Sequence, residues 1–180
     1  MTVTTSLYRG LSVFNTVKEM AMLKEASEEL AKKVFSFGFE TFGEMESTLE
    51  LIFSPPGASV ILHMAALKCG VHLYRRLKRK TGTKEEALNY LSELKNKENW
   101  GKLSFQDVDF VNGSGRIVIF DSFETVARKG RKARKSGDPC CHFFRGFLAG
   151  FLSEMFKKPI TVNEEKCVGK GDKHCEFVFE

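Results

Sequence analysis

Four of the five cysteines in this 180-residue chain fall between residues 140 and 175, and two acidic residues stand among them. In chain order these groups are Cys140-Cys141, Glu164-Glu165, Cys167 and Cys175. Thiolate sulfur and carboxylate oxygen both suit Zn²⁺ in a tetrahedral site. An odd number of cysteines without an export signal favours reduced or metal-bound thiols over a disulfide framework. The pattern therefore predicts a zinc site.

The spacing of these residues assigns the zinc ligands only in part. Cys167 and Cys175 can face each other across a hairpin, and Cys141 at the start of a helix could add a third thiol. The fourth ligand would be Glu164 or Glu165. Alternation along a regular strand favours Glu165, whereas Glu164 requires a bulge or twist at the strand end. Because the protein would supply all four ligands, the site would be structural.

Plainer explanations compete with the metal site. The four clustered thiols could be buried without a metal, packed as small apolar groups. His142 and His174 lie beside them, where a histidine is more often a satisfied hydrogen-bond partner than a ligand. Cys69 could face a cavity, but we expect a buried, inert thiol there.

Hydrophobic periodicity indicates the elements that must position these residues. A broad apolar face at helical spacing predicts a helix over 141–157. Two hairpins are expected, one turning at Asn112-Gly113-Ser114-Gly115 and one at Gly169-Lys170-Gly171-Asp172. The fold class is therefore α+β, with a four-stranded antiparallel sheet in two hairpins covered by helices. The expected strands are 103–111, 116–121, 160–167 and 175–180.

The first half of the chain is predicted to be helical. Apolar residues keep helical spacing over 13–35 and 39–52, until Pro55-Pro56-Gly57 ends the pattern. We divide the chain into an N-terminal helical arm, residues 1–54, and a domain, residues 55–180. The arm could pack on its own domain or on a second copy, and we favour contact in a homodimer.

Two more helices are expected at the start of the domain. The helix over 59–80 carries an apolar surface wide enough to be buried on more than one side. Thr83 and Glu86 form a capping box for a helix that runs to Asn96.

The net charge of +5 comes from two local clusters, residues 75–80 and 128–135. Either cluster could meet phosphate, but no aromatic residue interleaves the second one as a stacking platform would need. We therefore favour solvated helix ends or loops over nucleic-acid binding. The N-terminus lacks a signal peptide, and His63 and Lys68 break the longest apolar stretch, so we expect a cytoplasmic protein without a transmembrane segment.

Residues 138–179 resemble the 4-vinyl-reductase domain family. The resemblance rests on Asp138-Pro139-Cys140-Cys141-His142, Gly146, Gly150, Glu164, Cys167-Val168-Gly169-Lys170-Gly171-Asp172 and Cys175-Glu176-Phe177. That family includes the aromatic-effector sensor domains of bacterial regulators, and is distantly similar to TRAPP vesicle-tethering subunits. The resemblance implies a structural zinc held by Cys141, Glu164, Cys167 and Cys175.

The resemblance also implies a hydrophobic pocket for a small aromatic or acyl-like ligand. Periodicity offers Phe120, Phe144, Phe147 and Phe151 as its lining. The expected function is a non-enzymatic sensory module that acts through an unidentified effector protein. One alternative is a reductase of a tetrapyrrole vinyl group, against which stand the lack of a dinucleotide fingerprint, an acid-base pair and an open metal position. The other is an assembly subunit like the tethering proteins.

Overall fold

The computed structural model describes residues 38–128 and 139–180, which belong to one compact unit, Ser36–Glu180. Most of the predicted arm and residues 129–135 of the second basic cluster lie outside the described residues. Each strand and helix expected within the described ranges is present. The elements are α2 (Phe39–Leu77), α3 (Lys84–Lys97), β1 (Lys102–Asp109), β2 (Ser114–Phe120), α4 (Phe123–Arg128), α5 (His142–Phe156), β3 (Val162–Lys166), the short 3-10 helix η1 (Val168–Lys170) and β4 (Cys175–Phe179).

The four strands form one antiparallel sheet in the order β1-β2-β4-β3, which confirms the predicted fold class. The two hairpins meet through β2 and β4, where Ile119 pairs with Cys175. Gly113 makes the first turn with a φ of 66°, a left-handed conformation that glycine adopts without strain. In the second hairpin the register shifts between Glu164 and Lys166, so β3 carries an irregularity close to the predicted metal site.

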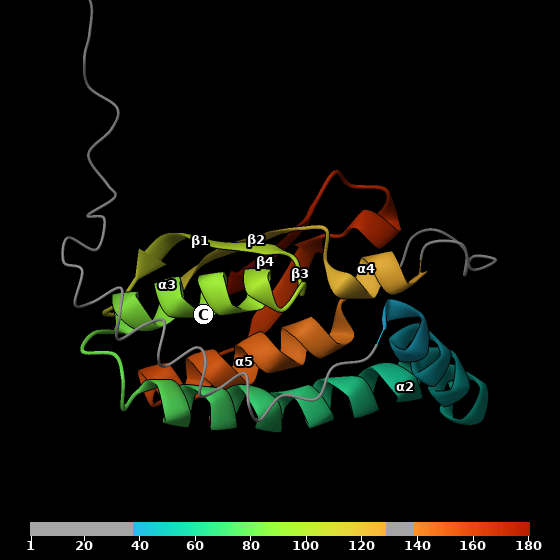
Figure 1. Cartoon of the computed structure of the whole chain (residues 1–180), viewed down its shortest axis with the longest axis horizontal. Coiled ribbons are helices and arrows are strands. Elements are labelled where there is room, and N and C mark those ends of the chain that lie inside the picture. The colour runs from blue at the N-terminus through green and yellow to red at the C-terminus, as the bar shows by residue number, and fades with distance from the viewer. Residues whose placement is uncertain (1–37, 129–138) are drawn as a thin grey trace, which may run out of the picture. The chain divides into compact units, whose positions relative to one another are not determined.

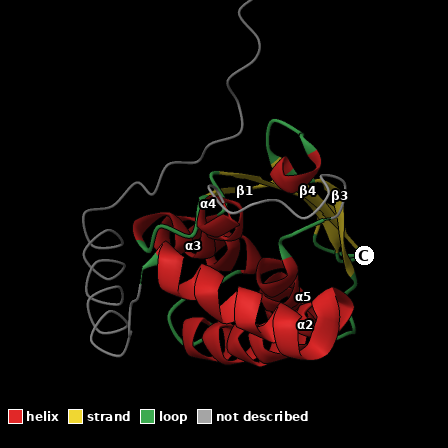
Figure 2. Ribbon diagram, turned by 90° about the vertical axis from the view of Figure 1, so that its right-hand side faces the viewer, coloured by secondary structure: helices red, strands yellow, loops and turns green. Residues whose placement is uncertain are grey.

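Helix α5 lies between the sheet and α2, as Figure 1 shows. Figure 2 shows α2, α3 and α5 on the same face of the sheet. Alternate residues of β2 and β4 point toward α5, whose apolar face meets them. This interface forms the centre of the core. Its fully buried side chains are Ile117, Ile119, Phe144, Leu148, Phe151, Leu152, Phe177 and Phe179.

Helix α2 passes through the proline pair that was expected to end it. Ser54 adopts φ 64° and ψ 161°, so the helix kinks immediately before Pro55 and Pro56 and then continues to Leu77. A residue before proline is disfavoured in the α region, and proline itself is tolerated in a first helical turn. The predicted boundary between arm and domain at residue 54 thus coincides with a kink inside α2.

Three glycines bring α2 and α5 into backbone contact. A Cβ added at Gly70 would lie 2.0 Å from the Phe147 carbonyl oxygen, and one at Gly146 would lie 2.2 Å from that of His63. Gly150 is equally close to α2. The smooth patch predicted at Gly146 and Gly150 is therefore used for close packing, but against a helix and not against the sheet.

The outer face of α2 is apolar and exposed among the described residues. The prediction that this helix is buried on more than one side is wrong for these residues, because Val60 and Met64 are 61% and 54% exposed. In the described part of the chain α2 is also the one helix long and apolar enough to cross a membrane. Core helices pass the same test, so this is weak evidence for a span. The exposed large apolar residues of α2 are Phe39, Met45, Leu51, Ile52, Phe53, Val60, Ile61 and Met64.

Replacing Gly150 with alanine tests the contact between α2 and α5. The added Cβ would lie 2.0 Å from the Leu67 carbonyl oxygen. The two backbones must then move apart, so we expect the free energy of unfolding to fall by about 1–3 kcal/mol or more. Gly38→Ala is the control, because a Cβ there meets nothing within 4 Å. Equal urea unfolding midpoints for the two variants would contradict the contact.

Candidate functional site

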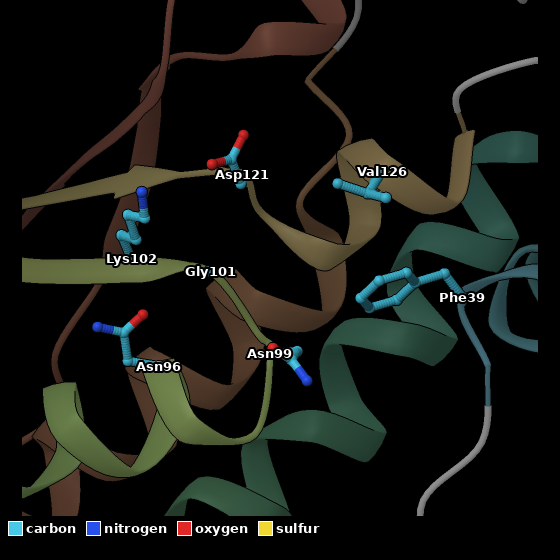
Figure 3. Close-up of a pocket in the computed structure, with 7 residues that line it drawn as sticks. All are labelled: Phe39, Asn96, Asn99, Gly101, Lys102, Asp121 and Val126. Carbon is cyan, nitrogen blue, oxygen red and sulfur yellow. The ribbon is translucent and has the colours of Figure 1, made fainter.

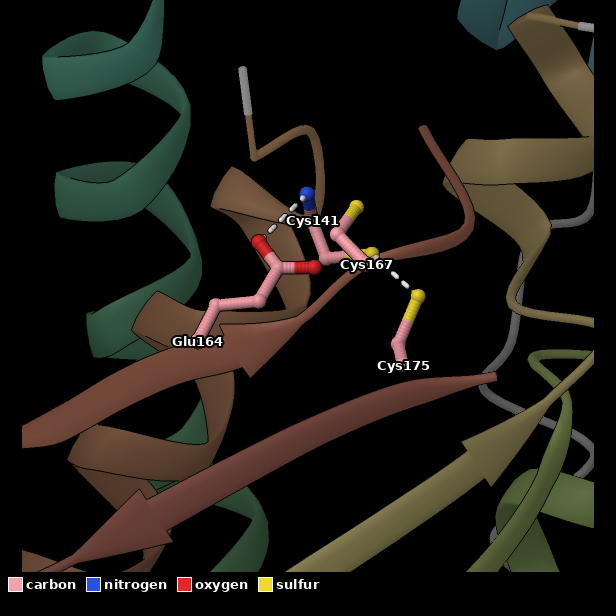
Figure 4. A group of neighbouring side chains, drawn as sticks. All are labelled: Cys141, Glu164, Cys167 and Cys175. Atoms are coloured by element: carbon pink, nitrogen blue, oxygen red, sulfur yellow. Dashed lines mark hydrogen bonds between the residues drawn. The ribbon is translucent and has the colours of Figure 1, made fainter. Parts of the chain in front are cut away.

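Four side chains from separate elements converge beside the start of α5. Cys141 is the N-cap of α5, Glu164 lies in β3, Cys167 follows β3, and Cys175 begins β4. One ligand atom from each lies within 4.8 Å of all the others, and the three cysteines are buried. Figure 4 shows the thiols and the Glu164 carboxylate directed into one small volume. This arrangement could hold a metal ion.

The hairpin between β3 and β4 holds two of the thiols in place. The Cys167 backbone N–H donates to Asp172 Oδ2 at 2.8 Å, and the Cys167 carbonyl accepts from Lys170 N at 2.8 Å. Gly171 closes the turn with a φ of 101°. The Val168 N–H then points to Cys175 Sγ at 3.4 Å. Backbone hydrogen bonds therefore fix Cys167 opposite Cys175 without any metal.

The irregularity in β3 decides which glutamate joins the thiols. The register shift between Glu164 and Lys166 breaks the strict alternation of the strand, as a bulge would. Glu164 accordingly lies with the cysteines, whereas Glu165 is exposed and outside the group. His174 is also outside it and contacts Glu176, with Nε2 3.3 Å from Oε2.

The geometry and the unused valence of the cluster fit a tetrahedral thiolate-binding cation. Two sulfurs on one zinc ion lie about 3.8 Å apart, since each Zn–S bond is about 2.3 Å. Cys141 Sγ and Cys175 Sγ are 3.5 Å apart. Glu164 Oε2 accepts from the Cys141 N–H at 3.2 Å, but Glu164 Oε1 is buried without a hydrogen-bond partner. A bound cation would give that oxygen a partner.

Without a cation the cluster concentrates negative charge. Hydrogen bonds from Cys140, Cys141 and Cys175 hold the pKa of the Cys167 thiol well below its ordinary value. Burial, reinforced by the charge at Cys167, raises the pKa of Glu164 to about 8. A divalent cation would favour the ionised form of both groups, because it replaces mutual repulsion with attraction.

The residues predicted to line a ligand pocket divide into two places. Phe144, Phe147 and Phe151 are buried along α5, whereas Phe120 is 46% exposed and its ring centroid lies 5.3 Å from that of His174. The three buried rings pack with Trp100, whose ring centroid lies 5.0 Å from that of Phe147. Trp100 was not singled out from the sequence, although it is the chain's single tryptophan.

A buried lysine lies within this aromatic cluster. Lys95 is 5% exposed, and its Nζ lies 3.6 Å from the Trp100 ring centroid and 4.7 Å from that of Phe147. The ammonium also pairs with Glu98 Oε2 at 2.6 Å. Burial lowers the pKa of Lys95, while Glu98 acts in the opposite direction. Its apolar stem and charged tip thus place one polar group among aromatic rings, a position that helical periodicity alone did not reveal.

A surface hollow of about 260 Å³ lies near the start of α2. In Figure 3, Phe39 and Val126 lie at one side of it and Asn96, Lys102 and Asp121 at the other. A second hollow of about 240 Å³ borders β2 and β4. Neither is lined by the phenylalanines predicted to form a ligand pocket.

Two further predictions meet the structure near the cluster and on α2. Cys69, expected to be buried, is exposed. Arg128 of the second basic cluster is not free to meet phosphate, because its guanidinium pairs with both oxygens of the buried Glu46, with Nε 2.9 Å from Oε2. This pair joins α4 to the first half of α2.

Residues 119–180 match the family model of the vinyl-4-reductase domain, and they contain all four members of the metal-binding cluster. These residues form a vinyl-4-reductase domain. The 4-vinyl-reductase resemblance seen in the sequence is thereby confirmed.

Curated relatives match this chain over short segments. An uncharacterised protein of Methanocaldococcus jannaschii, MJ0855, is 34% identical over 82 residues, which are 42% of this chain and 34% of that protein. A second from the same organism, MJ1642, is 46% identical over 41 residues, 23% of this chain and 26% of that protein. The chain thus spans about a third or less of the length of these relatives.

Solved structures share the fold. The phenol-responsive sensory domain of the transcription activator PoxR, crystallised with phenol, aligns with a TM-score of 0.72 at 20% identity, over 88% of this chain and 90% of that one. A vinyl-4-reductase family protein from Methanocaldococcus jannaschii gives 0.56 at 22% identity, over 95% and 98%. A trafficking protein particle complex subunit 3 from Naegleria fowleri, covalently bound to palmitic acid, gives 0.55 at 14%, over 79% and 93%.

Within the vinyl-4-reductase domain, sequence reasoning missed a buried carboxylate next to the cluster. Glu124 Oε1 accepts from the Phe143 N–H at 2.9 Å and Oε2 from the Phe144 N–H at 2.8 Å, so Glu124 caps the start of α5. Burial raises the pKa of Glu124 to about 8, although the two hydrogen bonds act in the opposite direction. Glu124 lies in α4, a six-residue helix that no sequence pattern indicated.

The raised pKa of Glu124 predicts how stability changes with pH. A carboxyl whose pKa is higher in the folded state contributes stability at low pH that is lost as pH rises toward about 8. Glu124→Gln should therefore flatten the fall in unfolding free energy between pH 5 and 8, by up to about 1.4 kcal/mol per pH unit. Urea unfolding of chelator-treated protein measures this, with the exposed Glu85→Gln as control. An unchanged slope in Glu124→Gln would refute it.

Proposed function

We propose that this chain is a metal-stabilised binding module for a small hydrophobic ligand and that it acts through a partner protein. The observation that carries the proposal is the aromatic cluster along α5 with one buried ammonium, Lys95, against Trp100 and Phe147. Ligand sites typically combine aromatic walls with a few polar groups that fix orientation. The fold likeness to the PoxR domain, which was crystallised with phenol, supports the ligand class.

We propose zinc as the metal and a structural role for it. Three thiolates and a carboxylate suit zinc better than magnesium or calcium, which prefer oxygen ligands. Cys141, Glu164, Cys167 and Cys175 would fill all four positions, leaving no place for a reacting water. The ion would join the start of α5 to the hairpin of β3 and β4. Thiols in this role need a reducing compartment, which agrees with the expected cytoplasmic location.

Native mass spectrometry of protein purified without added metal tests the centre. We expect one zinc ion per chain, and its loss in Cys175→Ser, because a tetrahedral site that loses a thiolate binds zinc far more weakly. Cys69→Ser is the matched control, since Cys69 is exposed and outside the cluster. Metal-free wild-type protein, or zinc retained in full by Cys175→Ser, would refute the zinc centre.

The ligand is proposed to bind beside Lys95. A hydroxyl or anionic group of an aromatic molecule would meet the Lys95 ammonium, and its ring would pack on Trp100 and Phe144, whose ring centroids are 5.6 Å apart. The predicted lining residues Phe147 and Phe151 belong to the same cluster, with ring centroids 6.5 Å apart. Lys95 supplies the orienting group that those rings lack.

Lys95→Met tests this placement, with phenol as the probe. Methionine keeps much of the apolar stem but removes the ammonium. We expect phenol to bind wild-type protein and to bind the variant at least about tenfold more weakly, since a hydrogen bond to a charged group contributes about 1.5–3 kcal/mol. Isothermal titration measures both affinities, and the exposed Lys97→Met is the control. Unchanged affinity in Lys95→Met, or no binding by wild type, would contradict the placement.

The exposed apolar face of α2 favours a second candidate function, assembly with another chain. Large apolar side chains such as Leu51 and Phe53, 86% and 51% exposed, are typical of an interaction surface. The fold likeness to the trafficking complex subunit agrees with this alternative. We propose a homodimer through this face, which the native mass spectra would report as a two-chain mass. The reductase alternative has no comparable observation in the described residues.

A further inference from the structure

The fourth cysteine of the C-terminal group, Cys140, has a place beside the metal cluster but not within it. We propose that Cys140 is a reserve ligand that replaces Glu164 and converts the centre from three thiolates and a carboxylate to four thiolates. The inference rests on the proposed metal centre, because it concerns the ligands of the same ion.

The position of the Cys140 sulfur supports this role. Cys140 is 1% exposed, and its Sγ lies 3.4 Å from Cys167 Sγ. That separation matches the 3.5 Å between Cys141 Sγ and Cys175 Sγ, two members of the cluster. Both are close to the distance of about 3.8 Å expected for two sulfurs on one zinc ion. Cys140 is thus as near to one member of the cluster as two of its members are to each other.

The local backbone leaves room for this sulfur. A Cβ at Gly169 would lie 2.8 Å from Cys140 Sγ and 3.5 Å from Cys167 Sγ. Any side chain at Gly169 would therefore displace Cys140 from Cys167. The φ of Gly169 is not in the left-handed region, so this glycine serves space and not backbone conformation.

The chemistry of the exchange is balanced. Glu164 and Cys140 each contribute one negative charge when bound, so replacing one with the other leaves the net charge of the centre unchanged. The incoming thiol loses its proton on binding, and the departing carboxylate keeps its hydrogen bond from the Cys141 N–H or takes up that proton. Arg128 lies close enough to Cys140 to favour its thiolate.

Exchange fits the geometry better than a fifth simultaneous ligand. The ligand atoms of Cys141, Glu164, Cys167 and Cys175 all lie within 4.8 Å of one another, and Cys140 is not part of that group. Cys140 approaches from the side of Cys167 and η1, whereas Glu164 approaches from β3 (Figure 4). A four-thiolate centre would also prefer softer metals than the mixed one.

A double-mutant cycle on the full chain with Co²⁺ as the probe tests the proposal. The sulfur-to-cobalt charge-transfer absorption rises with the number of bound thiolates. Glu164→Gln should still bind one Co²⁺ per chain, with stronger charge-transfer absorption than wild type, and Cys140→Ser alone should resemble wild type. Combining Cys140→Ser with Glu164→Gln should weaken Co²⁺ binding at least about tenfold relative to Glu164→Gln. Combining Cys69→Ser with Glu164→Gln is the matched control and should equal Glu164→Gln.

The possible outcomes separate this inference from the zinc centre. Equal Co²⁺ affinity in Glu164→Gln with and without Cys140→Ser would overturn the reserve ligand and leave the centre standing. Weaker charge-transfer absorption in Glu164→Gln would do the same. No Co²⁺ binding by wild type would refute the centre and the inference together. If Glu164→Gln does not fold, Glu164→Asp replaces it, because aspartate keeps the charge but shortens the reach, and the same comparisons apply.

Discussion

The first turn of α5 is the point on which the rest of the fold depends. The initial N–H groups of a helix have no partners within it and attract negative charge. Here two buried carboxylates from different elements supply that charge: Glu124 accepts from Phe143 and Phe144, and Glu164 accepts from Cys141. These bonds place the Cys141 thiol and join α4, α5 and β3 before any metal is considered.

From that point, two kinds of contact carry the position of α5 across the domain. On one side its apolar face meets β2 and β4, and on the other Gly70, Gly146 and Gly150 allow its backbone to touch that of α2. The Arg128–Glu46 pair ties α4 to α2 independently. Close-packed interfaces transmit small shifts because they cannot deform gradually. A ligand beside Phe147 would therefore act on a helix that touches both the metal cluster and α2.

The aromatic cluster and the exposed face of α2 give this arrangement an input and an output. Lys95 is held by Glu98 and two aromatic rings, an arrangement that compensates in part for burying its charge. On the far side of α2, apolar side chains such as Val60 and Met64 remain exposed in the described residues. Sensing in the core and association through α2 are thus compatible within one fold.

The sequence by itself determined the local elements of this protein, because helix caps, turns and periodicity depend on neighbouring residues. The Thr83–Glu86 capping box, the Gly113 turn and the α+β class followed from such patterns. So did the thiols of the cluster, while the family resemblance selected Glu164. Tertiary structure alone decided what depends on distant segments: the shift in β3 that brings Glu164 to the thiols, the capping by Glu124, and the burial of Lys95 against Trp100. Packing between elements far apart in the chain sets these features, and no local pattern encodes it.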